Sequence, residues 1–375
     1  MLIYNNMGID EEMLKRINDV ADKVIREKRR VNIDYELLEK ILRKRLNETV
    51  RRNSSNIEIV IPIKKEIMIK TALDFLKSLD EEFYKKATAL ILQEDNKIKM
   101  NIYNKHKIKE YGQEDEFGVR EFTETGEVDT YRGRANINIP IEGQLKKGKE
   151  EILEENTGTL KDLYILVHEI THLFDFDITK TSPKKEELLG KKSKYIHSLV
   201  RDMLCETTTF MFEDLLTDYL LKEGVYSKDA IKQENNRRIN SSIGDSRLVY
   251  TQLLLAKEKE KNGVITKDSV ERLMRENNIS PMQVQKIAMQ LVNNKDSMLF
   301  RNRYALAGII APTIVKKYND DKEDGIKVIK QYLKETKEDN LEGVFEILGI
   351  EKNENGINEL IKNMKERESD NDIER

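Results

Sequence analysis

The sequence predicts a mostly α-helical protein with a small β-sheet, an α+β fold. Three observations support this class. Apolar residues recur at helical spacing from about residue 158 almost to the end of the chain. Only five prolines interrupt its 375 residues. The strict alternation that indicates a strand is confined to two short stretches, 97–107 and 136–141.

The N-terminal part divides at a polar stretch, residues 51–56. Two amphipathic, highly charged helices precede it, so we expect a helical N-terminal segment over 1–56 and a main domain over 57–375. In the main domain we expect a helix over 65–92 and a strand over 97–107. An acidic, glycine-containing loop over 108–130 and a second strand over 136–141 are expected to follow.

The C-terminal part is expected to be helical with short connections. A lysine-rich connection covers 179–194, and the charged tail over 366–375 is expected to fray. The predicted helices lie near 159–174, 195–223, 240–262, 267–277, 281–294, 298–318, 323–336, 340–348 and 355–367.

One stretch carries a recognisable chemistry, the sequence His168-Glu169-Ile170-Thr171-His172. Residues four apart on a helix face the same side, so two imidazoles can bind one Zn²⁺ ion. Glu169 lies close enough to act as a general base on a water at that metal. The chain has only four histidines, and this pattern arises by chance well under ~1% of the time.

The alternative is an amphipathic helix with two incidental surface histidines. The neighbours of the motif argue against it, because apolar residues surround the motif on almost every side and predict a buried helix. Buried histidines and a buried glutamate need partners, and a metal ion provides one.

A third ligand is expected from the helix predicted over 195–223. Glu206 and Glu213 are seven residues apart and share one face, and threonines and aromatic residues follow Glu206. We predict Glu206 as the third zinc ligand and Glu213 as a residue that orients a ligand. The alternative is that these are capping or solvated glutamates.

The remaining candidate ligands are less favoured. His106 lies in a basic stretch and is interpreted as a surface residue, and His197 is interpreted as solvent-facing or as an outer partner of a ligand. Cys205 points about 100° away from Glu206 and is interpreted as a small buried apolar residue.

Composition excludes several classes of function. The net charge is −3 with both signs interleaved, which argues against nucleic-acid or membrane-surface binding. No stretch has the roughly 18 apolar residues of a membrane span. A single cysteine and the lack of a signal-peptide pattern predict a cytoplasmic protein.

The sequence resembles the oligoendopeptidase F branch of the thimet-oligopeptidase-like (M3) zinc metallopeptidases, in a shortened and divergent form. The resemblance is carried by the stretches 157–162, 206–221, 247–252 and 349–351. It implies a zincin-type core with an H-E-x-x-H helix and a glutamate helix, and a peptide groove with 136–141 as its edge strand. Thr171 stands where the family usually has glycine, and much of the family's N-terminal lobe is missing.

The resemblance also implies an oxyanion donor, for which Tyr304 is the plausible residue in the stretch 300–308. Arg301 or Arg303 could replace a missing donor, bind a substrate carboxylate, or form a solvated basic patch.

We therefore expect a zinc metallopeptidase with one Zn²⁺ ion on His168, His172 and Glu206, which hydrolyses oligopeptides with Glu169 as base and Tyr304 as donor. Alternatives are a protease that acts on specific proteins through an open groove and a non-catalytic zincin-like protein. A peptide substrate is the expected partner, and the oligomeric state is left open.

Overall fold

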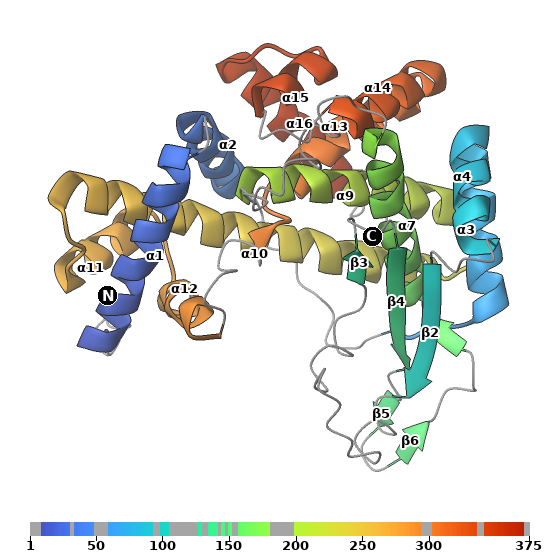
Figure 1. Cartoon of the computed structure of the whole chain (residues 1–375), viewed down its shortest axis with the longest axis horizontal. Coiled ribbons are helices and arrows are strands. Elements are labelled where there is room, and N and C mark those ends of the chain that lie inside the picture. The colour runs from blue at the N-terminus through green and yellow to red at the C-terminus, as the bar shows by residue number, and fades with distance from the viewer. Residues whose placement is uncertain are drawn as a thin grey trace.

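The computed structural model describes residues 9–30, 34–48, 59–92, 98–104, 127–129, 134–141, 144–146, 149–151, 157–180, 199–293, 302–335 and 341–370. Most of these residues are helical and the strands are short, which confirms the mostly α fold with small β-sheets (Figure 1).

Long helices dominate the order of elements along the chain. The helices are α1 (Glu11–Arg30), α2 (Tyr35–Glu48), α3 (Lys65–Leu79), α4 (Glu81–Leu92), α7 (Leu160–Lys180), α9 (Leu199–Glu223), α10 (Lys228–Asn262), α11 (Lys267–Glu276), α12 (Pro281–Asn293), α13 (Ala307–Asp320), α14 (Lys322–Glu335), α15 (Leu341–Leu348) and α16 (Glu354–Asp370). The strands are β1 (Pro62–Lys64), β2 (Ile98–Asn104), β3 (Glu127–Asp129), β4 (Arg134–Ile141), β5 (Gln144–Lys146), β6 (Lys149–Glu151) and β7 (Thr157–Thr159).

The helix predicted over 65–92 is in fact two helices, because Asp80 interrupts it. The Asp80 backbone is extended, with φ −159° and ψ 138°, so α3 ends there. The Asp80 carboxylate then accepts a hydrogen bond from the backbone N–H of Glu82 at 2.8 Å, which caps the first turn of α4. Apolar periodicity continues across both helices and therefore hides the break.

Other boundaries also differ from the sequence-based expectation. Helix α10 begins about one dozen residues before the predicted start near 240, and α13 begins at Ala307 rather than near 298. Helix α16 continues to Asp370, so the first part of the predicted frayed tail is helical. Strand β3 lies within the segment that was predicted to be a loop.

The small sheets show that 136–141 is not simply an edge strand. Strand β4 is the middle strand of the order β2-β4-β3, and it pairs in parallel with β2 from Ala135 to Ile141. Strand β3 pairs antiparallel with its first residues, Arg134 to Asn136. The prediction of a peptide-binding edge at this place is therefore wrong for the β2 side of the strand, where the backbone groups are already paired. The other two sheets are the antiparallel pairs β1-β7 and β5-β6.

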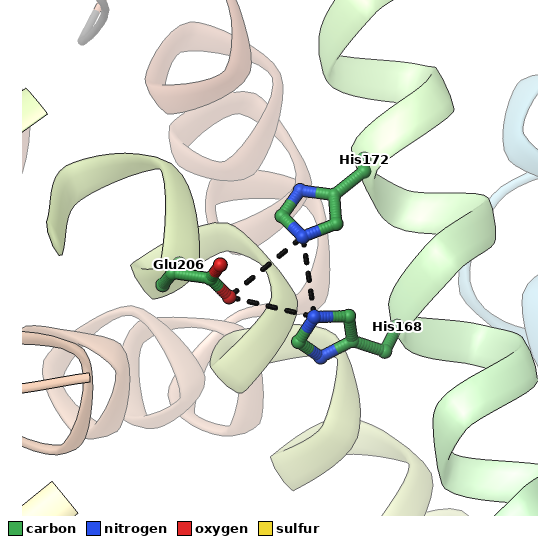
Figure 2. Close-up of side chains that lie close together, drawn as sticks. All are labelled: His168, His172 and Glu206. Carbon is green, nitrogen blue, oxygen red and sulfur yellow. Dashed lines mark hydrogen bonds and ion pairs between the residues drawn. The ribbon is translucent and has the colours of Figure 1, made fainter. Parts of the chain in front are cut away.

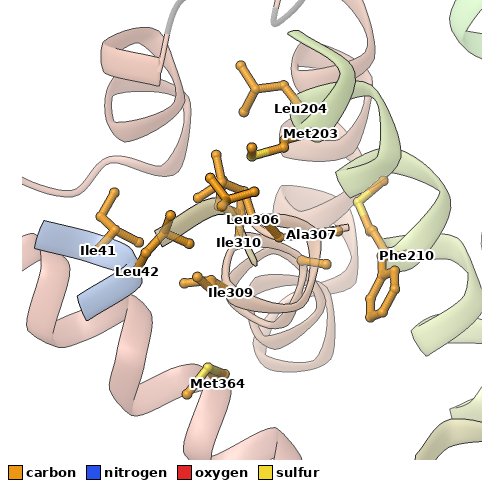
Figure 3. Close-up of a cluster of buried hydrophobic side chains, with 14 of the residues drawn as sticks. Ile41, Leu42, Met203, Leu204, Phe210, Leu306, Ala307, Ile309, Ile310 and Met364 are labelled. Atoms are coloured by element: carbon orange, nitrogen blue, oxygen red, sulfur yellow. The ribbon is translucent and has the colours of Figure 1, made fainter. Parts of the chain in front are cut away.

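Helix α9 lies at the centre of the helical core. Its residues are buried almost continuously from Met203 to Leu216, and it packs against α7, α10 and α13. Figure 3 shows apolar side chains of α2, α9, α13 and α16 meeting in one cluster, including Leu42, Phe210, Ile310 and Met364. A helix surrounded in this way is apolar on almost every face, so polar residues on it need specific partners.

The N-terminal helices pack on the main helical body, with α1 against α10 and α12 and α2 against α10 and α16. The division predicted at residue 56 stays a prediction, since 49–58 lie outside the described residues. In the part of the chain that the structure describes, no helix combines the length and the apolar character that crossing a membrane requires.

Candidate metal centre

Helix α7 carries both histidines of the motif. Its start is fixed by Asp162, whose carboxylate accepts hydrogen bonds from the backbone N–H and the hydroxyl of Thr159, at 2.7 and 2.6 Å. Val167 and Ile170 are fully buried and fix the rotation of the helix. His168 and His172 therefore project to the same side, with their Nε2 atoms 3.1 Å apart.

Helix α9 brings Glu206 to the same point (Figure 2). Its Oε2 lies 3.4 Å from His168 Nε2 and 3.7 Å from His172 Nε2. A tetrahedral ion with bonds of about 2.1 Å requires its ligand atoms to be roughly 3.4 Å apart. The donor set fits a divalent cation, and this group of side chains could hold one metal ion.

Glu213 fixes the orientation of His168. Its Oε1 lies 2.9 Å from His168 Nδ1, so a proton on Nδ1 is donated to the carboxylate and leaves the lone pair of Nε2 for a metal. Glu206 and Glu213 thus lie on one face of α9, and both contact His168.

Beneath Glu213 lies a buried arginine, Arg238 of α10. Its Nε donates to Glu213 Oε2 at 2.5 Å, and its Nη2 donates to Asp214 Oδ1 at 3.1 Å. The guanidinium also stacks on Phe210, with its carbon atom 4.6 Å from the ring centroid. The sequence pattern does not single out Arg238, because its neighbour Arg237 has the same side chain but is exposed on the other face of the helix.

The threonines that follow Glu206 satisfy their own hydroxyls locally. Thr207 donates to the carbonyl of Met203 at 2.9 Å, and Thr209 donates to the carbonyl of Glu206 at 2.8 Å. Thr209 also lies 3.2 Å from Glu206 Oε2. Because their hydroxyls are hydrogen-bonded within α9, Thr207 and Thr209 can be buried next to Glu206 without an unsatisfied polar group.

Burial and ion pairs shift the pKa values of the two histidines in opposite directions. Burial lowers the pKa of His168, but the hydrogen bond and charge of Glu213 outweigh it and raise this pKa to about 9. A metal ion at this imidazole would therefore displace the proton of Nε2. Burial dominates at His172 and lowers its pKa to about 3, so this imidazole is neutral and has a lone pair to offer. Burial raises the pKa of Glu213, but Arg238 and His168 outweigh it and bring this pKa to about 2.

Glu169 and Tyr304 both lie at this site. Glu169 is 7% exposed, and burial raises the pKa of its carboxyl, which is the direction a general base requires at neutral pH. The Tyr304 ring packs against His168 and Phe210, with ring centroids 6.3 and 6.0 Å apart, and burial raises the pKa of its phenol. A phenol that keeps its proton is a hydrogen-bond donor.

The other residues weighed as site members have different outcomes. Arg303 is an unexpected partner of the site, since its Nε lies 3.0 Å from Glu206 Oε1. Cys205 is half-buried rather than fully buried. His106, His197 and Arg301 lie outside the described residues, so the interpretations made for them stay predictions.

Comparison with known proteins gives one structural similarity. A crystal structure from Chlamydophila abortus named "putative peptidase" superposes with a TM-score of 0.55 and 13% sequence identity, over 97% of this chain and 55% of the other. At this identity the similarity shows the fold alone, and this chain spans about half the length of that structure. No family model matches the sequence. No curated protein matches it either.

Proposed function

We propose that this protein is a zinc-dependent metalloendopeptidase that hydrolyses oligopeptides. The observation that carries the proposal is the triangle of His168 Nε2, His172 Nε2 and Glu206 Oε2, with sides of 3.1, 3.4 and 3.7 Å. Two histidines and one glutamate are the ligands of a known type of catalytic zinc site, which keeps a fourth position open. Nitrogen-rich sites of this kind favour zinc over magnesium or calcium.

A bound zinc ion would polarise the scissile carbonyl and lower the pKa of a water molecule towards 7. The chain supplies the proton transfers. Glu169 takes a proton from the attacking water and later gives it to the leaving amine. Tyr304 donates a hydrogen bond to the substrate oxygen as negative charge develops there, and one such donor contributes about 3–4 kcal/mol in comparable sites.

The finer assignment, to the oligoendopeptidase F branch of the M3 peptidases, rests on the sequence resemblance over 157–162, 206–221, 247–252 and 349–351. The structural neighbour named a peptidase supports a peptidase at a coarser level. Because this chain spans about half of that neighbour, the size and sequence of its substrates are part of the proposal.

The test compares wild type with Glu169→Gln, and uses Glu258→Gln as a matched control. Glu258 is also 7% exposed and binds Arg272, but it belongs to α10 and lies outside the proposed site. Metal content is measured by mass spectrometry, and hydrolysis is followed with a peptide library. Glu169→Gln is expected to keep one zinc ion and lose about 10²–10⁴-fold in activity, while Glu258→Gln keeps both.

The outcomes separate the alternatives. Full activity in Glu169→Gln would remove this residue as the general base. A wild type that carries zinc but cleaves no peptide would favour a non-catalytic metal-binding protein. Cleavage of an intact protein but of no short peptide would favour a protease with an open groove.

A further inference from the structure

The two oxygens of the Glu206 carboxylate face different partners, in addition to the Thr209 hydroxyl. Its Oε2 faces the two histidine nitrogens, whereas its Oε1 pairs with Arg303 Nε at 3.0 Å. Glu206 is only 3% exposed, whereas the Arg303 side chain is 46% exposed, so water screens this ion pair from the arginine side alone. Any cation at the histidines therefore shares its carboxylate ligand with a permanent positive charge, since arginine does not lose its proton.

Arg303 is fixed in this place by the turn that precedes α13. The hydroxyl of Ser242 donates to the Tyr304 carbonyl at 2.7 Å, and that of Ser246 donates to the Ala305 carbonyl at 2.7 Å. Asp245 accepts a hydrogen bond from the Tyr304 backbone N–H at 3.1 Å. These three residues lie on one face of α10, so one rigid helix holds the turn on both sides of Tyr304.

The metal ligands His168 and Glu206 therefore have outer partners of opposite charge, Glu213 and Arg303. Glu213 is an anion behind His168 and makes that imidazole a stronger donor. Arg303 is a cation behind Glu206 and withdraws negative charge from the carboxylate. By the same electrostatic argument, the first arrangement strengthens metal binding and the second weakens it.

We propose that Arg303 is a positioning residue that holds Glu206 in place and lowers the affinity of the site for its metal. The inference rests on the metal site of the proposed function, but it does not require that the protein hydrolyse peptides. Arg303 partly neutralises the carboxylate ligand, so more positive charge would remain on a bound metal. Such a metal would polarise a bound carbonyl more strongly but would be held with lower affinity.

The test measures zinc affinity by competition with a chelating indicator. Arg303→Met is expected to bind zinc about tenfold more tightly than wild type, because it removes the positive charge next to the Glu206 ligand. Arg303→Lys keeps the charge and is expected to stay near the wild-type affinity. Arg272→Met is the matched control, since Arg272 is similarly exposed, at 42% against 46%, and also pairs with a buried glutamate. Its zinc affinity is expected to be unchanged.

A second pair of variants separates an effect through Arg303 from a general structural effect. Ser246→Ala loosens the turn and is expected to raise zinc affinity by a smaller factor than Arg303→Met. In the Arg303→Met background the same change is expected to have no further effect, because the positive charge is already gone. An equal effect in both backgrounds would overturn the link between the turn and the metal.

The result that overturns the proposal is an Arg303→Met variant that binds zinc as wild type does or more weakly. That outcome would make Arg303 only an orienting hydrogen-bond donor. A wild type that binds no zinc overturns the metal site itself. Normal zinc affinities with no peptide hydrolysis contradict the proposed function but leave this inference intact.

Discussion

The buried arginine beneath the metal site gives a sharp prediction about stability. Arg238→Met removes a side chain that is 5% exposed and pairs with two carboxylates, Glu213 and Asp214. Methionine fills much of the volume but offers neither a charge nor a hydrogen-bond donor. Asp214 keeps Arg367, 4.0 Å away, whereas Glu213 keeps the imidazole of His168.

Removing one partner of a buried ion pair costs about 3–5 kcal/mol, because the remaining buried charge loses its main compensation. For a chain of 375 residues, an unfolding entropy of about 2.1 cal/mol/K per residue converts this cost to a melting-temperature decrease of roughly 4–6 °C. Glu213→Gln should cost less, about 1–3 kcal/mol, because Arg238 keeps Asp214 and the face of Phe210.

The assay is urea unfolding followed by far-ultraviolet circular dichroism, with a chelator present so that metal binding does not contribute. The double variant Arg238→Met with Glu213→Gln is expected to be more stable than Arg238→Met alone, since the uncompensated charge is gone. An Arg238→Met protein within about 1 kcal/mol of wild type would refute the reasoning, because it would mean that Glu213 needs no buried cation.

Two further predictions concern α10 and α14. Burial raises the pKa of Asp245 to about 7. As pH rises from about 4 to 7, wild type should therefore lose up to about 4 kcal/mol of stability relative to Asp245→Asn, and the difference should level off above pH 7. Thermal melts across this pH range measure the difference, and a constant value would contradict the raised pKa. Gly325→Ala would place a Cβ atom of α14 2.2 Å from the Cα of Tyr318 in α13, and should lower the free energy of unfolding in urea by about 2–3 kcal/mol. The control Gly244→Ala has no atom within 4 Å of the new Cβ and should be neutral or stabilising. Equal effects of the two substitutions would show that α13 and α14 can move apart freely.

The two helices of the site were predictable from local patterns. The spacing of His168 and His172 places both imidazoles on one face, and the spacing of Glu206 and Glu213 does the same on the next long helix. These relations depend only on helical geometry and on the need of buried polar groups for partners. The pairing of Glu213 with His168 follows once the two helices are known to pack.

The partners outside these helices were not predictable in the same way. Arg238 follows Arg237 directly, and only packing decides that one is buried against Glu213 while the other is exposed. Arg303 had several interpretations, and its ion pair with Glu206 depends on how α10 holds the turn before α13. The break at Asp80 did have a local signal, an aspartate followed by Glu81 and Glu82, which is typical of a helix start.

The division of the ligands between two helices has a consequence for folding kinetics. Residues 168 and 172 belong to α7 and residue 206 to α9, so the complete ligand set forms only when these two helices come together. An unfolded chain offers the two histidines as a weak local site, and the full affinity arises only when α7 has docked on α9. The rate of zinc uptake during refolding would therefore report when the interface between α7 and α9 forms. The rate of zinc release from the native protein would report how often that interface opens.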